Sequence, residues 1–333
     1  MRYLHFIPLL LVAQPVDAAA QRPEAGLVRL EREIARLASS AGGPMGVAAV
    51  HLETGRAVYL NPDERFPLAS SYKVPIAVQL LTRVDRGELR LDSMVTLRPS
   101  DLHPGSGTLA DLLDDPGVSL SLRNYLELML LISDNSATDV VLHAAGGARA
   151  VTDRIAALGV DGMSVDRPTL RLIADFAGWS GLPADSQMSP GAWREASART
   201  TRAQADSAHA AFNRDPRDTA TPRGMALLLQ KIWRREALSD PSTHLLLDIM
   251  TRSTTGALRI KGLLPSGVSV AHKTGTIGGT TNDVGIVTLP DNGGHVAVVV
   301  MVKASALPVE TRERAIAHVA RAVYDYFLFN PGG

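Results

Sequence analysis

Strand-forming segments lie near both ends of this 333-residue chain, whereas helix-forming segments occupy its middle. Residues 45–64 alternate as two strands around a turn at Thr54–Gly55, and residues 267–303 contain three further β-branched runs. Between them, residues 70–234 repeat apolar side chains mainly at helical spacing. Because a sheet has to bury its apolar faces against another layer, we predict one antiparallel sheet built from the two ends, with helices packed on it and a helical lobe between.

Capping residues mark the boundaries of several predicted helices. Gly42 follows an amphipathic segment and is expected to end it, since glycine readily takes the left-handed conformation of a helix C-terminus. Thr221 and Pro222 have the pattern of an N-cap followed by a first helical residue, and Ser189 and Pro190 repeat it. We therefore predict that one helix begins at each of these two pairs.

Residues 1–20 have the features of a secretory signal peptide. Arg2 precedes a short apolar run at residues 6–13, and small residues follow at residues 18–20. The run is too short to cross a bilayer, and the absence of cysteine excludes both disulfides and a lipid-modified cysteine anchor. We expect residues 21–333 to be secreted, periplasmic or extracellular, without a membrane anchor.

The composition narrows the possible partners. The 34 basic and 34 acidic residues give a formal net charge of zero, so the chain offers no electrostatic case for binding nucleic acid or an anionic membrane. No cluster of histidine, aspartate and glutamate has metal-ligand spacing, so we predict neither a metal nor a cofactor. The basic residues are mostly arginine, and the lysines are Lys73, Lys231, Lys261, Lys273 and Lys303. Their scarcity makes the position of each lysine informative.

The stretch FPLASSYKVPIAV, residues 66–78, holds a candidate nucleophile. Pro75 is disfavoured deep inside a helix, so the helix should begin only just upstream. Ser70 and Lys73 then share one face, whereas Ser71 points elsewhere. A serine near a helix N-terminus, beside an amine that can act as a base, has the layout of an activated nucleophile. One such spacing is expected by chance in a chain of this length, so it gains weight only with other motifs.

Two further polar motifs follow along the chain. Ser133, Asp134 and Asn135 occupy a turn between two predicted helices, where either helix capping or a binding role would explain them. The sequence KTGT at residues 273–276 lies on a predicted strand, where a lysine is unexpected. There the lysine either protects a sheet edge or serves a ligand that the neighbouring glycine allows to approach closely.

The motifs S-x-x-K, S-D-N and K-T-G in this order resemble those of class A β-lactamases and penicillin-binding serine hydrolases. TTG at Thr254–Gly256 and TND at Thr281–Asp283 extend the resemblance over nearly the whole mature chain. It implies an α+β fold of the β-lactamase/transpeptidase type, with a five-stranded antiparallel sheet flanked by helices plus an all-helical lobe. The sheet lobe would comprise about residues 25–66 and 235–333, and the helical lobe about residues 67–234.

The resemblance also implies roles for individual residues. Ser70 would attack a strained amide carbonyl and become an acyl ester, with Lys73 as a candidate base for its proton. Ser133 would pass a proton to the leaving nitrogen. Backbone N–H groups of Ser70 and Thr276 would form the oxyanion hole. Asn135 would hydrogen-bond the side-chain amide of the substrate.

The same resemblance implies a site for the substrate carboxylate, formed by Lys273, Thr274 and Thr276. Lys261 falls where some relatives carry a supporting arginine, although an ordinary surface charge explains it equally well. The expected partner is a small β-lactam or a peptidoglycan-like molecule, and we expect the protein to be a monomer.

The sequence departs from the family at the base for deacylation. Relatives carry a glutamate two residues after an arginine, whereas here Arg167 is followed by Thr169, and the asparagine expected four residues later is Ile173. Threonine cannot act as a carboxylate base near pH 7. Arg167 and Asp218 would pin the ends of this loop, which at residues 167–218 is far longer than the family loop.

Asp175, Asp185 and Glu195 in the long loop are candidates to replace the missing base, although simple exposure to solvent explains each of them. His103 is expected on the surface of a loop at the edge of the cleft.

Because the usual base for deacylation is missing, three functions stay open: a β-lactam hydrolase with a rearranged base, a penicillin-recognising DD-peptidase or esterase, and a non-turnover binder that stays acylated.

Overall fold

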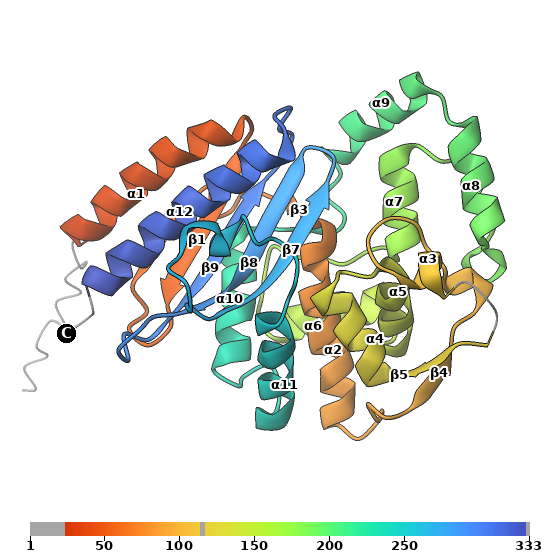
Figure 1. Ribbon diagram of the computed structural model, residues 1–333, viewed down its shortest axis with the longest axis horizontal. Helices are drawn as coiled ribbons and strands as arrows, with labels where there is room; N and C mark the ends of the chain where they lie inside the picture. The colour runs from red at the N-terminus through yellow and green to blue at the C-terminus, as the bar shows by residue number, and fades with distance from the viewer. Residues whose placement is uncertain (1–23, 114–116, 331–333) are drawn as a thin grey trace, which may run out of the picture.

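Strands from the two ends of the chain form one five-stranded antiparallel sheet (Figure 1), which confirms the predicted α+β fold. The strand order is β2-β1-β9-β8-β7, so β7 lies at one edge. The strands are β1 (Met45–His51), β2 (Ala57–Leu60), β7 (Val270–Ile277), β8 (Thr280–Thr288) and β9 (His295–Val302). The computed structural model describes residues 24–113 and 117–330, so the signal peptide predicted at residues 1–20 lies outside the described residues.

Alternating side chains of the central strand β9 build two cores. Its even-numbered residues pack with α1 (Ala25–Ala38) and α12 (Val309–Phe329) on one face of the sheet. Its odd-numbered residues face the remaining helices on the other side. Since β9 is covered on both faces, its sequence is a continuous apolar run rather than an alternation of apolar and polar residues. Gly42 has a φ of 68° just after α1, as its predicted role at the end of that helix requires.

The chain between β2 and β7 forms the helical side of the molecule. Its helices are α2 (Lys73–Asp85), α3 (Leu109–Leu112), α4 (Leu122–Leu131), α5 (Asn135–Ala144), α6 (Gly147–Ala157), α7 (Thr169–Ala177), α8 (Pro190–Arg199), α9 (Arg202–Phe212), α10 (Pro222–Trp233) and α11 (Asp240–Thr251). Two small sheets pair β3 (Phe66–Pro67) with β6 (Thr219–Ala220) and β4 (Met94–Thr96) with β5 (Ser119–Ser121). The boundary between the lobes stays a prediction, because α11 contacts both β7 and α4.

The two predicted N-caps are confirmed. The Thr221 hydroxyl accepts a hydrogen bond from the backbone N–H of Gly224 at the start of α10. The Ser189 hydroxyl likewise accepts from the backbone N–H of Ala192 at the start of α8. Each cap satisfies an N–H group that the first turn of a helix leaves without a partner, which explains why sequence alone could locate these boundaries.

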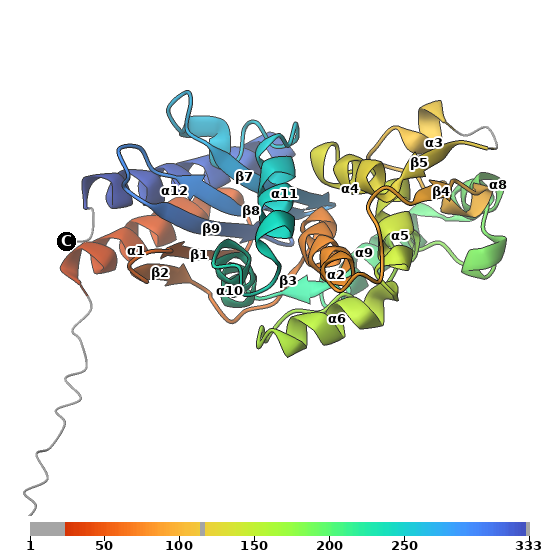
Figure 2. The same ribbon diagram turned by 90° about the horizontal axis from the view of Figure 1, so that it is seen from below.

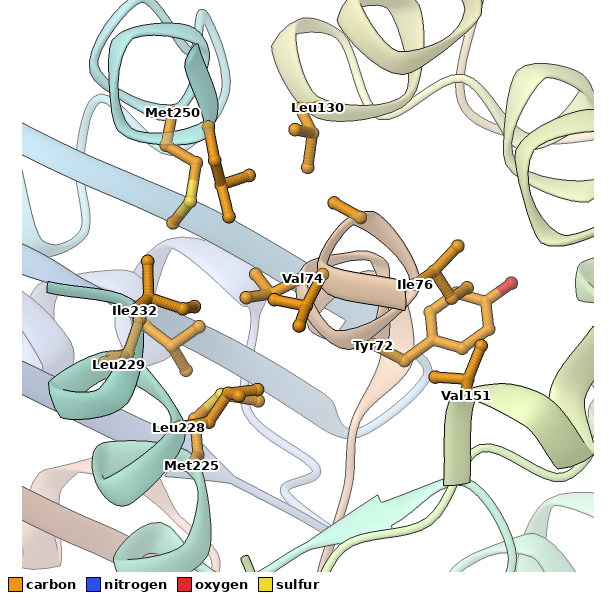
Figure 3. Close-up of a cluster of buried hydrophobic side chains, with 14 of the residues drawn as sticks. Tyr72, Val74, Ile76, Leu130, Val151, Met225, Leu228, Leu229, Ile232 and Met250 are labelled. Carbon is orange, nitrogen blue, oxygen red and sulfur yellow. The ribbon is translucent and has the colours of Figure 1, made fainter. Parts of the chain in front are cut away.

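Helix α2 is the centre of the larger core. In Figures 1 and 2 it lies between the sheet and helices α5 and α8. Its residues from Lys73 to Thr82 are all buried. Figure 3 shows Val74 of α2 facing the α10 side chains that include Ile232, while Leu130 of α4 and Val151 of α6 lie on other sides of the helix. A helix surrounded in this way must be apolar all round, and its position is fixed by packing on every face.

The chain enters α2 through a 3₁₀ turn rather than through the α-helical turn that was predicted. A 3₁₀ turn at Ala69–Tyr72 precedes the α-helix, which begins only at Lys73, so Ser70 lies in the turn rather than in the α-helix itself. Ala69 enters this turn with a φ of 45°, in the left-handed region that residues other than glycine rarely adopt. Such strain persists only where the surroundings fix the backbone, and it is typical of functional sites. Pro75 falls in the first turn of α2, where its missing N–H costs nothing.

The long segment at residues 167–218 folds into helices α7, α8 and α9, which are joined by aromatic contacts. The rings of Trp179 and Trp193 stack with their centroids 6.2 Å apart. Phe176 of α7 stacks on His209 of α9, with 4.1 Å between the ring centroids. The segment therefore has a small apolar core of its own, built on the face of α7 that α9 covers.

A buried salt bridge closes the base of this segment. Arg167 Nε lies 2.6 Å from Asp218 Oδ2, and Arg167 Nη1 also contacts Asp175 at 2.5 Å and Asp215 at 3.0 Å. The side chain of Asp218 is only 1% exposed. The two residues that the sequence places at the ends of the loop are therefore in direct contact.

We expect Arg167→Gln to lower the free energy of unfolding by about 3–5 kcal/mol, because it leaves the buried Asp218 carboxylate without its charged partner. The matched control is Arg199→Gln in α8, which removes an exposed ion pair with Glu195 and should cost about 0–1 kcal/mol. Urea denaturation measures both variants. Equal losses from the two substitutions would contradict a structural role for the buried pair.

Candidate active site

Ser70 lies in a cavity of about 300 Å³ between the helical side and the edge strand β7. The 3₁₀ turn before α2 supplies Ser70, the first residue of α5 is Asn135, and β7 supplies Thr276. The wall formed by α7 and the residues just after it is largely apolar and consists of Leu172, Ile173, Phe176 and Trp179, with Thr169 at its inner end. Three segments that are distant in the sequence thus meet around one hydroxyl.

The two neighbouring serines are in different environments. Ser71 is fully buried and its hydroxyl donates to the Leu68 carbonyl at 2.5 Å, whereas Ser70 is partly exposed in the cavity. Gly275 of β7 packs against this turn so closely that a Cβ there would lie 2.6 Å from the Leu68 oxygen and 3.1 Å from the Ser70 nitrogen. Only glycine allows β7 to approach the turn this closely. This close approach puts Thr276 beside Ser70.

Lys73 is fully buried at the start of α2. Its amine donates to the Ser133 carbonyl at 2.7 Å, to the Ser133 hydroxyl at 3.1 Å and to Asn135 Oδ1 at 3.0 Å. Burial lowers the pKa of Lys73 to about 7, although the charges of Asp134 and Asp139 oppose the shift. None of these hydrogen bonds is to Ser70, so Lys73 must exchange a partner before it can accept the Ser70 proton.

A second buried lysine reaches the same hydroxyl from the opposite side. Lys273 Nζ donates to the Ser133 hydroxyl at 3.0 Å and to the Thr274 carbonyl at 2.9 Å. Burial, followed by the charges of Lys73 and Arg259, holds the pKa of Lys273 well below its usual range. Two ammonium groups that share one buried hydroxyl repel each other, so the arrangement favours a neutral amine on at least one of them.

The S-D-N turn combines both of its expected roles. Asp134 caps α5 by accepting from Ala137 N–H at 2.8 Å, and it also accepts from the backbone N–H groups of Thr108 at 2.7 Å and Leu109 at 3.0 Å. Ser133 has a φ of 62°, which turns its hydroxyl toward the two lysines. The capping interpretation is therefore correct for Asp134, while Asn135 lines the cavity and the Ser133 hydroxyl accepts from the two lysines.

Asn135 links two segments at the edge of the cavity, α2 and the loop that contains Pro104. Its Oδ1 accepts from Lys73, and its Nδ2 donates to the Pro104 carbonyl at 2.8 Å. Both polar ends of the amide are therefore engaged before any substrate binds. Each end keeps one further position, a second lone pair and a second N–H, so the hydrogen bond that the resemblance implies between Asn135 and a substrate amide can form without loss of either partner.

Sequence analysis missed the arginine that supports the K-T-G strand. Arg259 is buried, and its Nη2 donates to the Thr276 hydroxyl at 2.6 Å while its Nη1 donates to the carbonyls of Gly275 at 3.2 Å and Asn282 at 2.8 Å. Lys261, which was considered for this place, instead directs its amine to the Thr251 carbonyl at 3.5 Å. The arginine precedes a 3₁₀ turn at Ile260–Leu263, which turns the two side chains apart.

The Thr274 hydroxyl is also held from outside its own strand. It lies 2.8 Å from the hydroxyl of Thr255, the middle residue of the TTG sequence. Gly256 follows with a φ of 70°, and a Cβ on it would clash with the Thr274 methyl group at 2.3 Å. These contacts explain why a conformationally free glycine follows two threonines at this position.

Thr169 lies on the wall of the Ser70 cavity as the first residue of α7. Its hydroxyl is hydrogen-bonded to the hydroxyl of Tyr72. None of the three carboxylates considered as replacement bases lines this cavity: Asp175 contacts Arg167, Asp185 contacts Arg171 and Glu195 contacts Arg199. Among the residues that the structure describes, the lining of the cavity contains no carboxylate at all.

The expectation of an exposed His103 was wrong. The histidine is 5% exposed, and its Nε2 lies 2.9 Å from Asp139 Oδ2. Burial opposes the charged imidazolium, but the charge and hydrogen bond of Asp139 outweigh it and raise the pKa of His103. Its partner belongs to α5 and is distant in the sequence, so no local pattern around His103 could have predicted the pair.

Comparisons with known proteins agree with this geometry. The sequence model described as the Beta-lactamase enzyme family matches residues 29–327. The extended-spectrum beta-lactamase PER-1 of Pseudomonas aeruginosa is 30% identical over 94% of this chain and 90% of its own length.

Two solved structures are also similar. A beta-lactamase from Chitinophaga pinensis has a TM-score of 0.73 at 32% identity, covering 89% of this chain and 98% of its own. The L158E mutant of PBP-A, as an acyl-enzyme complex with penicillin G, has a TM-score of 0.72 at 28% identity, covering 92% of this chain and 98% of its own. The fold is therefore of the β-lactamase/transpeptidase type, and this protein belongs to the β-lactamase enzyme family.

Proposed function

We propose that this protein is a serine hydrolase that opens β-lactam rings through an acyl-enzyme on Ser70. The observation that carries the proposal is the convergence of two buried lysines on the hydroxyl of Ser133, beside the turn that presents Ser70. Removing two amines from water costs free energy, and buried groups with strongly shifted pKa values are typical of catalytic sites. The names of the relatives support the same activity.

The first half-reaction follows from these contacts. Neutral Lys73 takes the proton of the Ser70 hydroxyl, whose oxygen attacks the lactam carbonyl. The backbone N–H groups of Ser70 and Thr276 stabilise the oxygen anion that forms. Ser133 then passes a proton to the leaving nitrogen and recovers one from Lys73, with which it already shares a hydrogen bond. The ring opens, and the acyl group stays on Ser70 as an ester.

The substrate carboxylate has a matching site on β7. The hydroxyls of Thr274 and Thr276 would donate hydrogen bonds to it. Arg259 supplies positive potential behind them, and the Lys273 amine lies beside the Thr274 carbonyl. Asn135 would contact the substrate side chain from the opposite edge of the cavity.

A second candidate function follows from the missing carboxylate in the cavity lining. An acyl-enzyme without an activated water is stable, and the protein would then behave as a penicillin-binding peptidase or esterase, or as a binder that is acylated once. The penicillin-acylated structure of the PBP-A mutant shows that a protein of this fold can be captured in the acylated state.

We also propose that residues 1–20 direct export and that residues 21–333 act outside the cytoplasm as a monomer. The basis is the sequence pattern of the N-terminal segment. Within the part of the chain that the structure describes, no helix combines the length and apolar character needed to cross a membrane.

We expect Ser70→Ala to abolish covalent labelling by a fluorescent penicillin, because it removes the hydroxyl in the cavity. Ser71→Ala is the matched control, since that hydroxyl donates to the Leu68 carbonyl and not to the cavity, and its loss should leave labelling intact. Gel fluorescence and intact-protein mass spectrometry detect the acyl group. Labelling that survives Ser70→Ala would refute the nucleophile assignment.

We expect Arg259→Gln to slow acylation by a carboxylate-bearing penicillin about 10- to 100-fold, the size expected for one lost charge-assisted interaction. Acylation by an ester that lacks the carboxylate should change far less. Lys261→Gln is the control, because its amine points to Thr251 and away from β7. Thermal melting of each variant accounts for any loss of folded protein. Equal losses for both kinds of substrate would mean that Arg259 only supports the fold.

A further inference from the structure

The one carboxylate close to the deacylation position lies behind the wall of the Ser70 cavity. Asp139 of α5 accepts from the backbone N–H of Thr169 at 2.7 Å and from that of Leu170 at 3.3 Å. Helix α7 begins after Pro168, which has no side chain able to accept these hydrogen bonds, so Asp139 caps α7 from a neighbouring helix. Thr169 therefore contacts the Asp139 carboxylate through its backbone and also lines the Ser70 cavity.

The hydroxyl of Thr169 is hydrogen-bonded to the hydroxyl of Tyr72, while the backbone N–H of Thr169 donates to Asp139 Oδ1. Burial raises the pKa of Tyr72 far above its usual value, so its hydroxyl stays protonated and can donate to Thr169 Oγ1. The proton of Thr169 is then free to be donated to Asp139. Burial alone would raise the pKa of Asp139, but His103 and hydrogen bonds from the Thr169 backbone and side chain lower it, so the carboxylate is ionised.

His103 contacts the Asp139 oxygen that does not bind Thr169. Its Nε2 lies 2.9 Å from Asp139 Oδ2, while Oδ1 of the same carboxylate accepts from Thr169. The imidazole thus orients the carboxylate toward α7 and stabilises its negative charge. Both line a second cavity of about 320 Å³, whose lining does not include Ser70.

We propose that Thr169 and Asp139 together replace the missing glutamate, with the Thr169 hydroxyl relaying the proton of the hydrolytic water to the Asp139 carboxylate. This inference rests on the proposed function, because it concerns the second half of the same reaction. Thr169 would contact the water directly, and Asp139 would act through it.

The step balances as follows. The water oxygen forms a bond to the ester carbonyl carbon while one of its O–H bonds breaks, and that proton goes to Thr169 Oγ1. Thr169 passes its own proton to Asp139. When the bond between the carbonyl carbon and Ser70 breaks, the proton returns from Asp139 through Thr169 to the serine oxygen. The sum consumes one water and yields the free acid, the serine hydroxyl and an ionised Asp139.

A purely structural role for Asp139 makes a different prediction. Capping of α7 uses the backbone N–H groups of Thr169 and Leu170, which remain when the Thr169 side chain is changed. Thr169→Val keeps the shape of the side chain and the cap but removes the hydroxyl, so it separates the relay from the cap. Thr169→Ser keeps the hydroxyl and is the conservative variant.

The test measures acylation and deacylation separately with a chromogenic cephalosporin, by stopped-flow absorbance and by mass detection of the acyl-enzyme. Thr169→Val should slow deacylation about 10²–10⁴-fold, the usual cost of losing a general base, while acylation stays within a few-fold. Thr169→Ser should restore most of the deacylation rate. Asp139→Asn should slow deacylation as much as Thr169→Val, and the double variant should be no slower than either single one.

Two outcomes would overturn the relay while leaving the proposed function intact. One is a Thr169→Val acyl-enzyme that hydrolyses at the wild-type rate. The other is a wild-type acyl-enzyme that persists as long as that of the variant, because the relay then contributes nothing. If wild-type protein neither hydrolyses the cephalosporin nor forms an acyl-enzyme, the proposed function itself fails, and absorbance with mass spectrometry distinguishes that result from the other two.

Discussion

The hydroxyl of Ser133 receives two buried lysine amines, at 3.1 Å from Lys73 and 3.0 Å from Lys273, and the site depends on this one arrangement. One amine comes from the first residue of the central helix α2, the other from the edge strand β7, and the hydroxyl comes from the turn before α5. Desolvation and mutual repulsion disfavour two charged amines there, so the fold has to hold them in place by packing on all sides. The burial of α2 and the close approach of Gly275 to the Ser70 turn meet this requirement.

The sequence was sufficient for features that depend on local patterns. Apolar periodicity located the sheet and helices, and N-caps such as Thr221 located helix starts, because each of these signals acts within a few residues. The three motifs likewise pointed to a site whose members the structure brings together. The 3₁₀ turn at Ala69–Tyr72 was missed, since nothing in composition distinguishes it from the first turn of an α-helix.

Several contacts between distant segments could not be predicted from local patterns. Arg259 and Lys261 are two positions apart, and only the path of the chain through the following turn decides which one faces Thr276. His103 looked like a surface residue because its partner Asp139 is in another helix. The Asp139 carboxylate behind Thr169 could not be predicted for the same reason, because it belongs to a helix distant in the sequence. The acidic residues considered in the long segment form ion pairs with arginines away from the Ser70 cavity.

The central claim is that burial makes Lys73 a neutral base near physiological pH. Its most direct test is an NMR titration of protein labelled with ¹³C at the lysine Cε positions, which is practical because the chain has few lysines, with the Lys73 signal assigned by its absence from Lys73→Met. Deprotonation with a midpoint near pH 7 is the predicted result. An amine that stays protonated above pH 9 would contradict the account, because Lys73 would then be charged near physiological pH and could not accept the Ser70 proton.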